Sequence, residues 1–247
     1  MSGIRDRILR RCLPLGAVVG ILLVVALGSG PTRGAERKTS GSEAHMTDKQ
    51  FIDEFRENLG WKALPEDLEK LIVFLTGIDG LGDISESEGD ISESFALLID
   101  DKVGLSRWSG QKAFLDRLHP FAAANGSGSF YAIWNDGSGR PLNQMPIVVF
   151  GDEGGEHIVA ENLRALWRLL GYGTEISVDH GGAFFHRDED AGESPYRADY
   201  LSWLKKNYGF SPIETSEEAG ALIDKAQAKY QKPFEEWAKP FFKAAGR

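Results

Sequence analysis

Two apolar stripes at helical spacing lie near the beginning of the main part of the chain. Phe51 and Phe55 are four positions apart, which predicts an amphipathic helix over residues 48–58. Pro65 suits the first turn of a second helix. The apolar stripe of that helix consists of Leu68, Leu71, Ile72 and Leu75. The pattern therefore predicts a pair of helices before any strand.

The middle of the chain changes to short apolar runs that are separated by turns rich in glycine, serine and acidic residues. The runs Phe130–Trp134 and Pro146–Phe150 predict two strands, and Glu156–Ala160 predicts a third. Asn162 is placed to cap a helix that continues through Leu170. This region is therefore predicted to form most of a β-sheet.

Two segments before these strands have patterns of their own. Residues 111–124 carry Phe114 and Leu118 at helical spacing, which predicts an amphipathic helix that Pro120 kinks or ends. Residues 94–99 predict a strand that follows an acidic, serine-rich loop.

The C-terminal part of the chain is predicted to be helical. An irregular, acidic segment over residues 173–195 comes first, and helical stretches follow at residues 196–208, 216–230 and 234–245. Helices, then antiparallel strands, then helices is the order typical of an α+β fold, with helices packed against one sheet and a helical C-terminal extension.

Residues 1–45 differ from the rest of the chain. A basic start precedes the uncharged residues 12–32, whose apolar centre is typical of a signal peptide or a single membrane anchor. On this interpretation the protein is exported or membrane-anchored, and any membrane contact is confined to residues 12–32. The alternative is that translation begins at Met46 and the protein is cytoplasmic. In both cases residues 46–247 are predicted to form a single domain.

The charge of that domain limits the class of partner. The chain has 28 Lys and Arg and 37 Asp and Glu, of which seven and three lie in residues 1–45. The remaining 21 basic and 34 acidic residues give residues 46–247 a net charge of −13. Such a domain repels nucleic-acid phosphates and attracts basic proteins. The only cysteine, Cys12, precedes the domain, which therefore has no disulfide, thiolate metal site or cysteine nucleophile.

No sequence motif indicates catalysis. The nucleophile elbow, the phosphate-binding loop and the dinucleotide-binding glycine motif are all absent, so we predict no enzyme and no cofactor. The repeated acidic segment over residues 82–95 fails the EF-hand pattern, because glycine falls at the seventh position of the loop and not the sixth.

A metal site is the remaining chemical alternative. Asp179, His180 and His186, with Asp188 close by, are chemically competent ligands. They lie in a glycine-containing loop without the regular spacing of metal-binding motifs, which favours surface residues. We therefore predict no metal, and a metal-dependent hydrolase built on His180 and His186 is the less favoured hypothesis.

Several short motifs resemble the SMI1/KNR4 (SUKH) superfamily. They are Phe121-Ala122, the Gly126–Ala132 turn and strand, the Pro146–Phe150 strand with its acidic turn, and Ile158–Leu163 leading into a helix. The resemblance implies a curved antiparallel sheet with flanking helices and no common catalytic residues. It also implies a role like that of bacterial immunity proteins, which bind and neutralise toxins, often nucleases. The leader and the long C-terminal helical extension depart from this pattern.

These observations favour a non-enzymatic protein-binding module of immunity type, whose partner is a basic toxin domain. The alternative is an exported or membrane-anchored interaction scaffold. One exposed aromatic ring and several acidic residues are expected to contact the partner. These expected contact residues are Trp134, Asp136, Asp152, Glu153, Asp188, Glu189 and Asp190.

Overall fold

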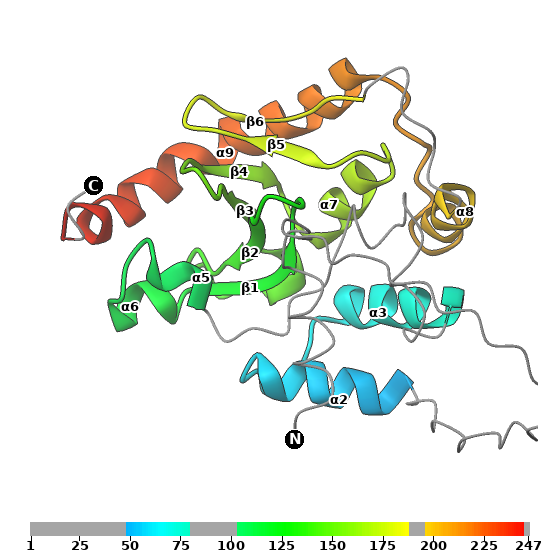
Figure 1. Ribbon diagram of the computed structural model, residues 1–247, viewed down its shortest axis with the longest axis horizontal. Helices are drawn as coiled ribbons and strands as arrows, with labels where there is room; N and C mark the ends of the chain where they lie inside the picture. The colour runs from blue at the N-terminus through cyan, green and yellow to red at the C-terminus, as the bar shows by residue number, and fades with distance from the viewer. Residues whose placement is uncertain (1–47, 80–102, 188–195, 245–247) are drawn as a thin grey trace, which may run out of the picture. The chain divides into compact units, whose positions relative to one another are not determined.

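A four-stranded antiparallel sheet with flanking helices forms the fold (Figure 1). The computed structural model describes residues 48–79, 103–187 and 196–244 of the chain. Each strand of the sheet pairs with the next along the chain. The strands are β1 (Leu118–Ala123), β2 (Phe130–Trp134), β3 (Ile147–Phe150) and β4 (Glu156–Ala160). The predicted α+β fold class is confirmed.

Helices precede and follow the sheet, as the sequence pattern predicts. They are α2 (Asp48–Asn58), α3 (Glu66–Asp79), α5 (Val103–Ser106), α6 (Lys112–Leu115), α7 (Leu163–Leu170), α8 (Arg197–Tyr208) and α9 (Ser216–Ala244), with a short 3-10 helix η2 (Leu142–Gln144). Helix α2 has the predicted bounds. The predicted cap of α7 is confirmed, because the side chain of Asn162 accepts a 3.0 Å hydrogen bond from the amide of Ala165.

The two faces of the sheet pack against different helices. Trp134 lies 5.2 Å from Phe234 of α9, measured between ring centroids. On the opposite face, Tyr131 stacks on Phe121, which in turn meets Trp167 of α7. Successive residues of a strand point to opposite faces, so Tyr131 and Trp134 of β2 reach different helices. Both faces are therefore buried, which explains why β3 is apolar at every position.

Helix α9 is continuous where two separate helices were expected, so that prediction is wrong. Pro233 and Pro240 lie inside it. An interior proline costs a helix about 3 kcal/mol, because one hydrogen bond is lost and the ring crowds the preceding turn. Within α9, the residues Phe234 and Ala238 are fully buried and Tyr230 is nearly so. Each large buried side chain contributes about 1.5–3 kcal/mol, and this packing keeps the helix whole.

The predicted helix over residues 111–124 is largely wrong as well. Only Lys112–Leu115 is helical, and β1 begins three residues later. Pro120 has no amide hydrogen for an α-helix, but it is tolerated on β1, which is an edge strand of the sheet. The pairing of β1 with β2 is irregular just after Pro120. The predicted strand over residues 94–99 lies outside the described residues.

A small hairpin lies within residues 173–195, which the sequence pattern predicted to be irregular. Its strands are β5 (Ile176–Val178) and β6 (Ala183–Phe185). The turn is closed by the Asp179 carboxylate, which accepts hydrogen bonds from the amides of Gly181 and Gly182 at 2.6 and 2.9 Å. Each strand has only three residues, too few for an alternating pattern to stand out.

Strand β4 is the last strand of the sheet, and a side chain from α9 covers part of its outer edge. The amide of Ile158 donates to the Oε1 atom of Gln231 at 2.7 Å, and Nε2 of Gln231 donates to the Glu156 carbonyl at 3.3 Å. The Gln231 side chain thus replaces the peptide group of a neighbouring strand. An exposed edge invites pairing with another chain, and this contact closes that stretch of the edge.

Candidate protein-interaction site

Of the expected acidic contacts, the structure describes Asp136, Asp152 and Glu153, and Asp136 lies apart from the other two. Asp136 follows β2 and Asp152 follows β3, and these two strands are antiparallel. Their register pairs Phe130 with Phe150 and Ile133 with Ile147. The two carboxylates therefore lie at opposite ends of the sheet, which we call the β2 end (Asn135–Arg140) and the β3 end (Gly151–Gly155 and the adjoining Asn125–Ser129 turn).

Trp134 does not supply the exposed aromatic ring that was expected. Its residue exposure is 2%, and its ring packs against Phe234 and Trp237 of α9. Trp134 is therefore a core residue. Among the remaining expected contacts, Asp188, Glu189 and Asp190 lie outside the described residues.

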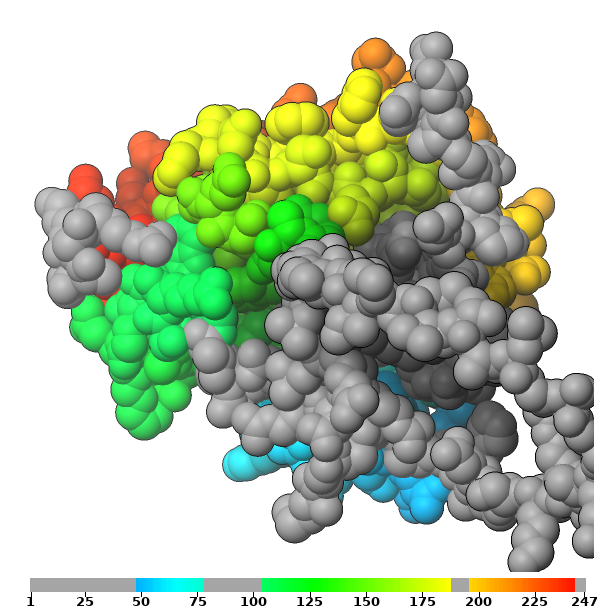
Figure 2. Space-filling view, in the orientation of Figure 1, coloured from blue at the N-terminus to red at the C-terminus, as the bar shows by residue number. Residues whose placement is uncertain are grey.

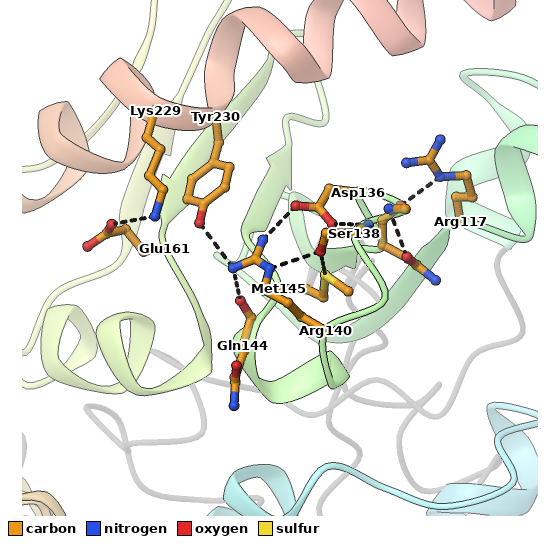
Figure 3. A network of polar contacts seen from close by, with 11 residues as sticks. Arg117, Asp136, Ser138, Arg140, Gln144, Met145, Glu161, Lys229 and Tyr230 are labelled. Carbon is orange, nitrogen blue, oxygen red and sulfur yellow. Dashed lines mark hydrogen bonds and ion pairs between the residues drawn. The ribbon is translucent and has the colours of Figure 1, made fainter.

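At the β2 end, Arg140 organises the loop through all three of its guanidinium nitrogens (Figure 3). Nη2 pairs with the Asp136 carboxylate at 2.5 Å, and Nε donates to the Ser138 hydroxyl at 2.9 Å. Nη1 donates to the Gln144 carbonyl at 2.9 Å and to the Tyr230 hydroxyl at 3.2 Å. The loop is thereby tied to α9, because Tyr230 belongs to that helix.

The electrostatics of the β2 end follow from this pairing. Burial alone would raise the pKa of Asp136, but hydrogen bonds from Ser138 and Arg140 and the positive charge of Arg140 outweigh it and lower the pKa. The pKa of Arg140 is raised, because contacts with Asp136 and Tyr230 overcome desolvation. The two opposite charges therefore persist together and largely cancel, so the β2 end has a structural role.

Arg117 supports the same loop from β1's side. Its Nε donates to the Asn135 carbonyl at 2.6 Å, and its guanidinium lies 4.9 Å from the ring centroid of Trp237. Desolvation lowers the pKa of Arg117, and the nearby charge of Asp136 opposes that effect. This cation is thus engaged with the core and the loop.

A second set of charges joins β4 to α9. Glu161 pairs with Lys225 at 2.6 Å and with Lys229 at 3.6 Å (Figure 3 shows the Lys229 contact). The hydrogen bond from Lys225 is the main cause of the lowered pKa of Glu161. These three side chains carry a net charge of +1, so the negative charge of Glu161 is fully compensated.

At the β3 end, Asp152 is held by neutral groups. Its Oδ1 accepts hydrogen bonds from the hydroxyls of Ser127 at 2.9 Å and Ser129 at 3.0 Å. The Ser129 hydroxyl also accepts from the Asp152 amide at 3.2 Å. Partial burial would raise the pKa of Asp152, but these hydrogen bonds prevail and lower it. The carboxylate is thus both ionised at neutral pH and fixed in position.

Two glycines let the β3 end pack directly on the β5–β6 hairpin. Gly154 and Gly155 have φ angles of 112° and 89°, which disfavour other residues. A Cβ on Gly155 would lie 2.2 Å from the Asp179 carbonyl oxygen, and one on Gly154 would lie 2.4 Å from the His180 ring. His157 Nε2 is 2.7 Å from the same Asp179 oxygen. The turn and the hairpin therefore form one continuous surface.

That surface is strongly acidic. Residues 151–157 and 174–186 contain no Lys or Arg, and their acidic residues are Asp152, Glu153, Glu156, Glu175 and Asp179. Within the described parts of the chain, no Lys or Arg forms an ion pair with Asp152, Glu153 or Asp179. Asp152, Glu153 and Asp179 are also exposed. Unlike the β2 end, this surface offers uncompensated negative charge to a partner.

Of the residues considered for a metal site, Asp179, His180 and His186 do not form one among the described residues, and Asp188 lies outside them. The Asp179 carboxylate is used in its own turn, and His157 contacts the Asp179 backbone. Among the residues that the structure describes, no group of three or more His, Cys, Asp or Glu side chains is placed to hold a metal ion. Over the same residues, none of the helices has both the length and the apolar character needed to cross a membrane.

One exposed aromatic residue was not anticipated from the sequence. Phe184 on β6 is 50% exposed, whereas Ala183 and Phe185 on either side are buried. A short apolar run in a sheet alternates between faces, so one of two adjacent phenylalanines is expected to face outward. Recognising this required knowing that the run forms a strand.

Comparisons with protein-family models, with curated proteins and with solved structures found no match to this chain. The resemblance to the SMI1/KNR4 superfamily stays a prediction.

Proposed function

We propose that this protein is a non-enzymatic protein-binding module of immunity type, which neutralises a basic toxin domain through its β3 end. The observation that carries the proposal is the set of exposed, uncompensated carboxylates of Asp152, Glu153 and Asp179 on one surface. The net charge of −13 over residues 46–247 supports the same conclusion, because it attracts a basic partner over a distance.

The fixed position of Asp152 suits recognition. Two serine hydroxyls already hold its Oδ1, and a partner's Lys or Arg can approach the other carboxylate oxygen. Because the side chain is ordered before binding, less conformational entropy is lost when the complex forms. The toxin is neutralised when this acidic surface covers its basic, substrate-binding face.

The β2 end does not serve this role. Asp136 is half-buried and its charge is balanced by Arg140, so a partner would have to break an existing ion pair before binding it. Such an exchange gives little net free energy.

Co-expression tests the proposal. The full chain is expressed together with a toxin encoded by a neighbouring gene, and both cell survival and complex formation are measured. We expect survival with the wild-type chain and a stable complex. Toxicity that persists together with no complex would contradict the proposed function.

A charge-matched pair of variants tests the surface. Asp152→Asn with Glu153→Gln removes two charges from the β3 end, and we expect about tenfold weaker binding, mostly through slower association. The control, Asp199→Asn with Asp224→Asn, removes two exposed charges from α8 and α9 and is expected to weaken binding much less. Equal effects of the two pairs would mean that only net charge matters.

A further inference from the structure

The outer face of the β5–β6 hairpin presents an aromatic ring to solvent. Phe184 pairs in register with Ser177, so both side chains lie on the same face, and both are exposed. The inner face carries Ile176 and Phe185, which are buried. In Figure 2 the hairpin, in yellow, lies at the surface of the view shown.

Exposure of this degree is unusual for a large apolar side chain in the part of the protein that the structure describes. Across the described residues, only Phe184 at 50% and Val73 at 42% stand out as large exposed hydrophobic side chains. A single exposed apolar residue is common and needs no explanation by itself. The surroundings of Phe184 are what distinguish it from Val73.

The hairpin that carries Phe184 is anchored at several points. The side-chain amide of Asn125 donates to the Ile176 carbonyl at 3.0 Å, and the Thr174 hydroxyl donates to the His186 carbonyl at 2.9 Å. Its turn is in contact with Gly154 and Gly155, as described above. Because the hairpin is already ordered, binding through the Phe184 ring does not cost the conformational entropy of ordering a mobile loop. This favours a role for the ring as an interface anchor.

The charge around the hairpin specifies the kind of partner. Residues 151–157 and 174–186, which include the β3–β4 turn and the hairpin, hold five acidic residues and no Lys or Arg. A second copy of this chain would place the same carboxylates against one another, which is unfavourable. A basic protein surface complements them, and an apolar recess in that surface would receive the ring.

We propose that the outer face of the β5–β6 hairpin is a docking surface for a basic protein, with Phe184 as the apolar anchor. The carboxylates of Asp179 in the hairpin turn and of Asp152 and Glu153 in the β3–β4 turn that packs on it supply the negative charge. The inference rests on the proposed function and deepens it by naming the contact. Aromatic anchors surrounded by polar groups carry much of the binding free energy in protein interfaces.

The test does not require the natural partner. Random peptides displayed on phage are selected on the immobilised full chain, and one enriched peptide is synthesised for titration. We expect enriched peptides to combine Lys or Arg with an aliphatic or aromatic residue. Phe184→Ser should lower the affinity for the synthetic peptide by about tenfold or more, whereas Phe184→Leu should retain most of the affinity.

Val73→Ser is the matched control, since it removes the other exposed hydrophobic side chain, and it should leave peptide affinity unchanged. Thermal unfolding of each variant checks that the fold is intact. No enriched peptide, selected peptides without basic residues, or equal binding by Phe184→Ser would each overturn the docking surface.

The two proposals fail separately. If the chain does not protect cells from the toxin but the basic peptides still depend on Phe184, the docking surface stands and the immunity role falls. If Phe184→Ser protects cells as well as the wild type and binds the toxin equally, the immunity role stands and the location of the contact is wrong.

Discussion

At the end of β2, Asp136 forms an ion pair with Arg140, whereas at the end of β3 Asp152 accepts hydrogen bonds from neutral serine hydroxyls. Both carboxylates have a lowered pKa, but the physical causes differ. At Asp136 an opposite charge contributes, and at Asp152 the hydrogen bonds come from neutral groups. The first arrangement removes net charge from the surface and the second preserves it.

This difference separates stability from recognition. The β2 end is tied to α9 through Tyr230, so its polar contacts position a loop against the core. The β3 end is tied to the β5–β6 hairpin and keeps its charge free for a partner. Two acidic turns that look alike in the sequence therefore have different roles, and four changes test the comparison.

The largest effect is expected from Arg140→Met. This variant leaves Asp136, whose side chain is 15% exposed, without its counter-ion, and it removes the hydrogen bond from Arg140 to the Tyr230 hydroxyl. We expect a loss of about 2–3 kcal/mol in the free energy of unfolding, measured by urea denaturation. Adding Asp136→Asn should recover part of the loss. A stability equal to the wild type would mean that the pair contributes nothing.

Ser129→Ala is the corresponding change at the β3 end. The Ser129 hydroxyl is buried and contacts both the carboxylate and the amide of Asp152. Its loss leaves a backbone donor without its partner, and we expect a cost of about 1–2 kcal/mol. Ser127→Ala is the control, because that hydroxyl is exposed and water can replace it. An equal cost for both variants would contradict the role of burial.

Stability should fall in acid, because Asp152 and Asp136 both have a lowered pKa in the folded protein. A carboxyl group of this kind stabilises the fold above its unfolded-state pKa, and the contribution is lost as the pH falls through the folded-state pKa. We expect the free energy of unfolding to decline below about pH 4. Asp152→Asn should make that decline shallower, and an unchanged slope would contradict the assignment.

Added salt should produce the smallest effect of the four changes, and it should separate the pKa of Asp136 most clearly from that of Asp152. Raising the ionic strength from about 0.1 M to 1 M shortens the screening length from about 10 Å to 3 Å. The pKa of Asp136, which depends partly on the charge of Arg140, should rise towards its ordinary value. The pKa of Asp152 should move less, because its hydrogen-bond donors are neutral. Carboxyl chemical shifts followed by NMR measure both, and equal shifts would remove the distinction.

Local sequence pattern was sufficient for some elements. Helix α2 was predicted with its bounds because Phe51 and Phe55 repeat at helical spacing and Gly60 follows. The cap at Asn162 and the strands β2 and β4 were also predicted, since each depends on neighbouring residues only. The one-piece helix α9 was missed because packing against the sheet outweighs the local effect of Pro233. The strand β1 was missed because Phe114 and Leu118 also fit a helical repeat.

For the candidate site, the sequence determined which residues are acidic, that they follow apolar strands in glycine-rich turns, and that the domain as a whole is negative. Tertiary structure decided which of those charges persist at the surface. The antiparallel register placed Asp136 and Asp152 at opposite ends of the sheet. Packing buried Trp134 in the core and left Phe184 exposed at the surface. The physical reason is that charge compensation and exposure depend on contacts such as Arg140 with Tyr230 across 90 residues of sequence, which no local pattern contains.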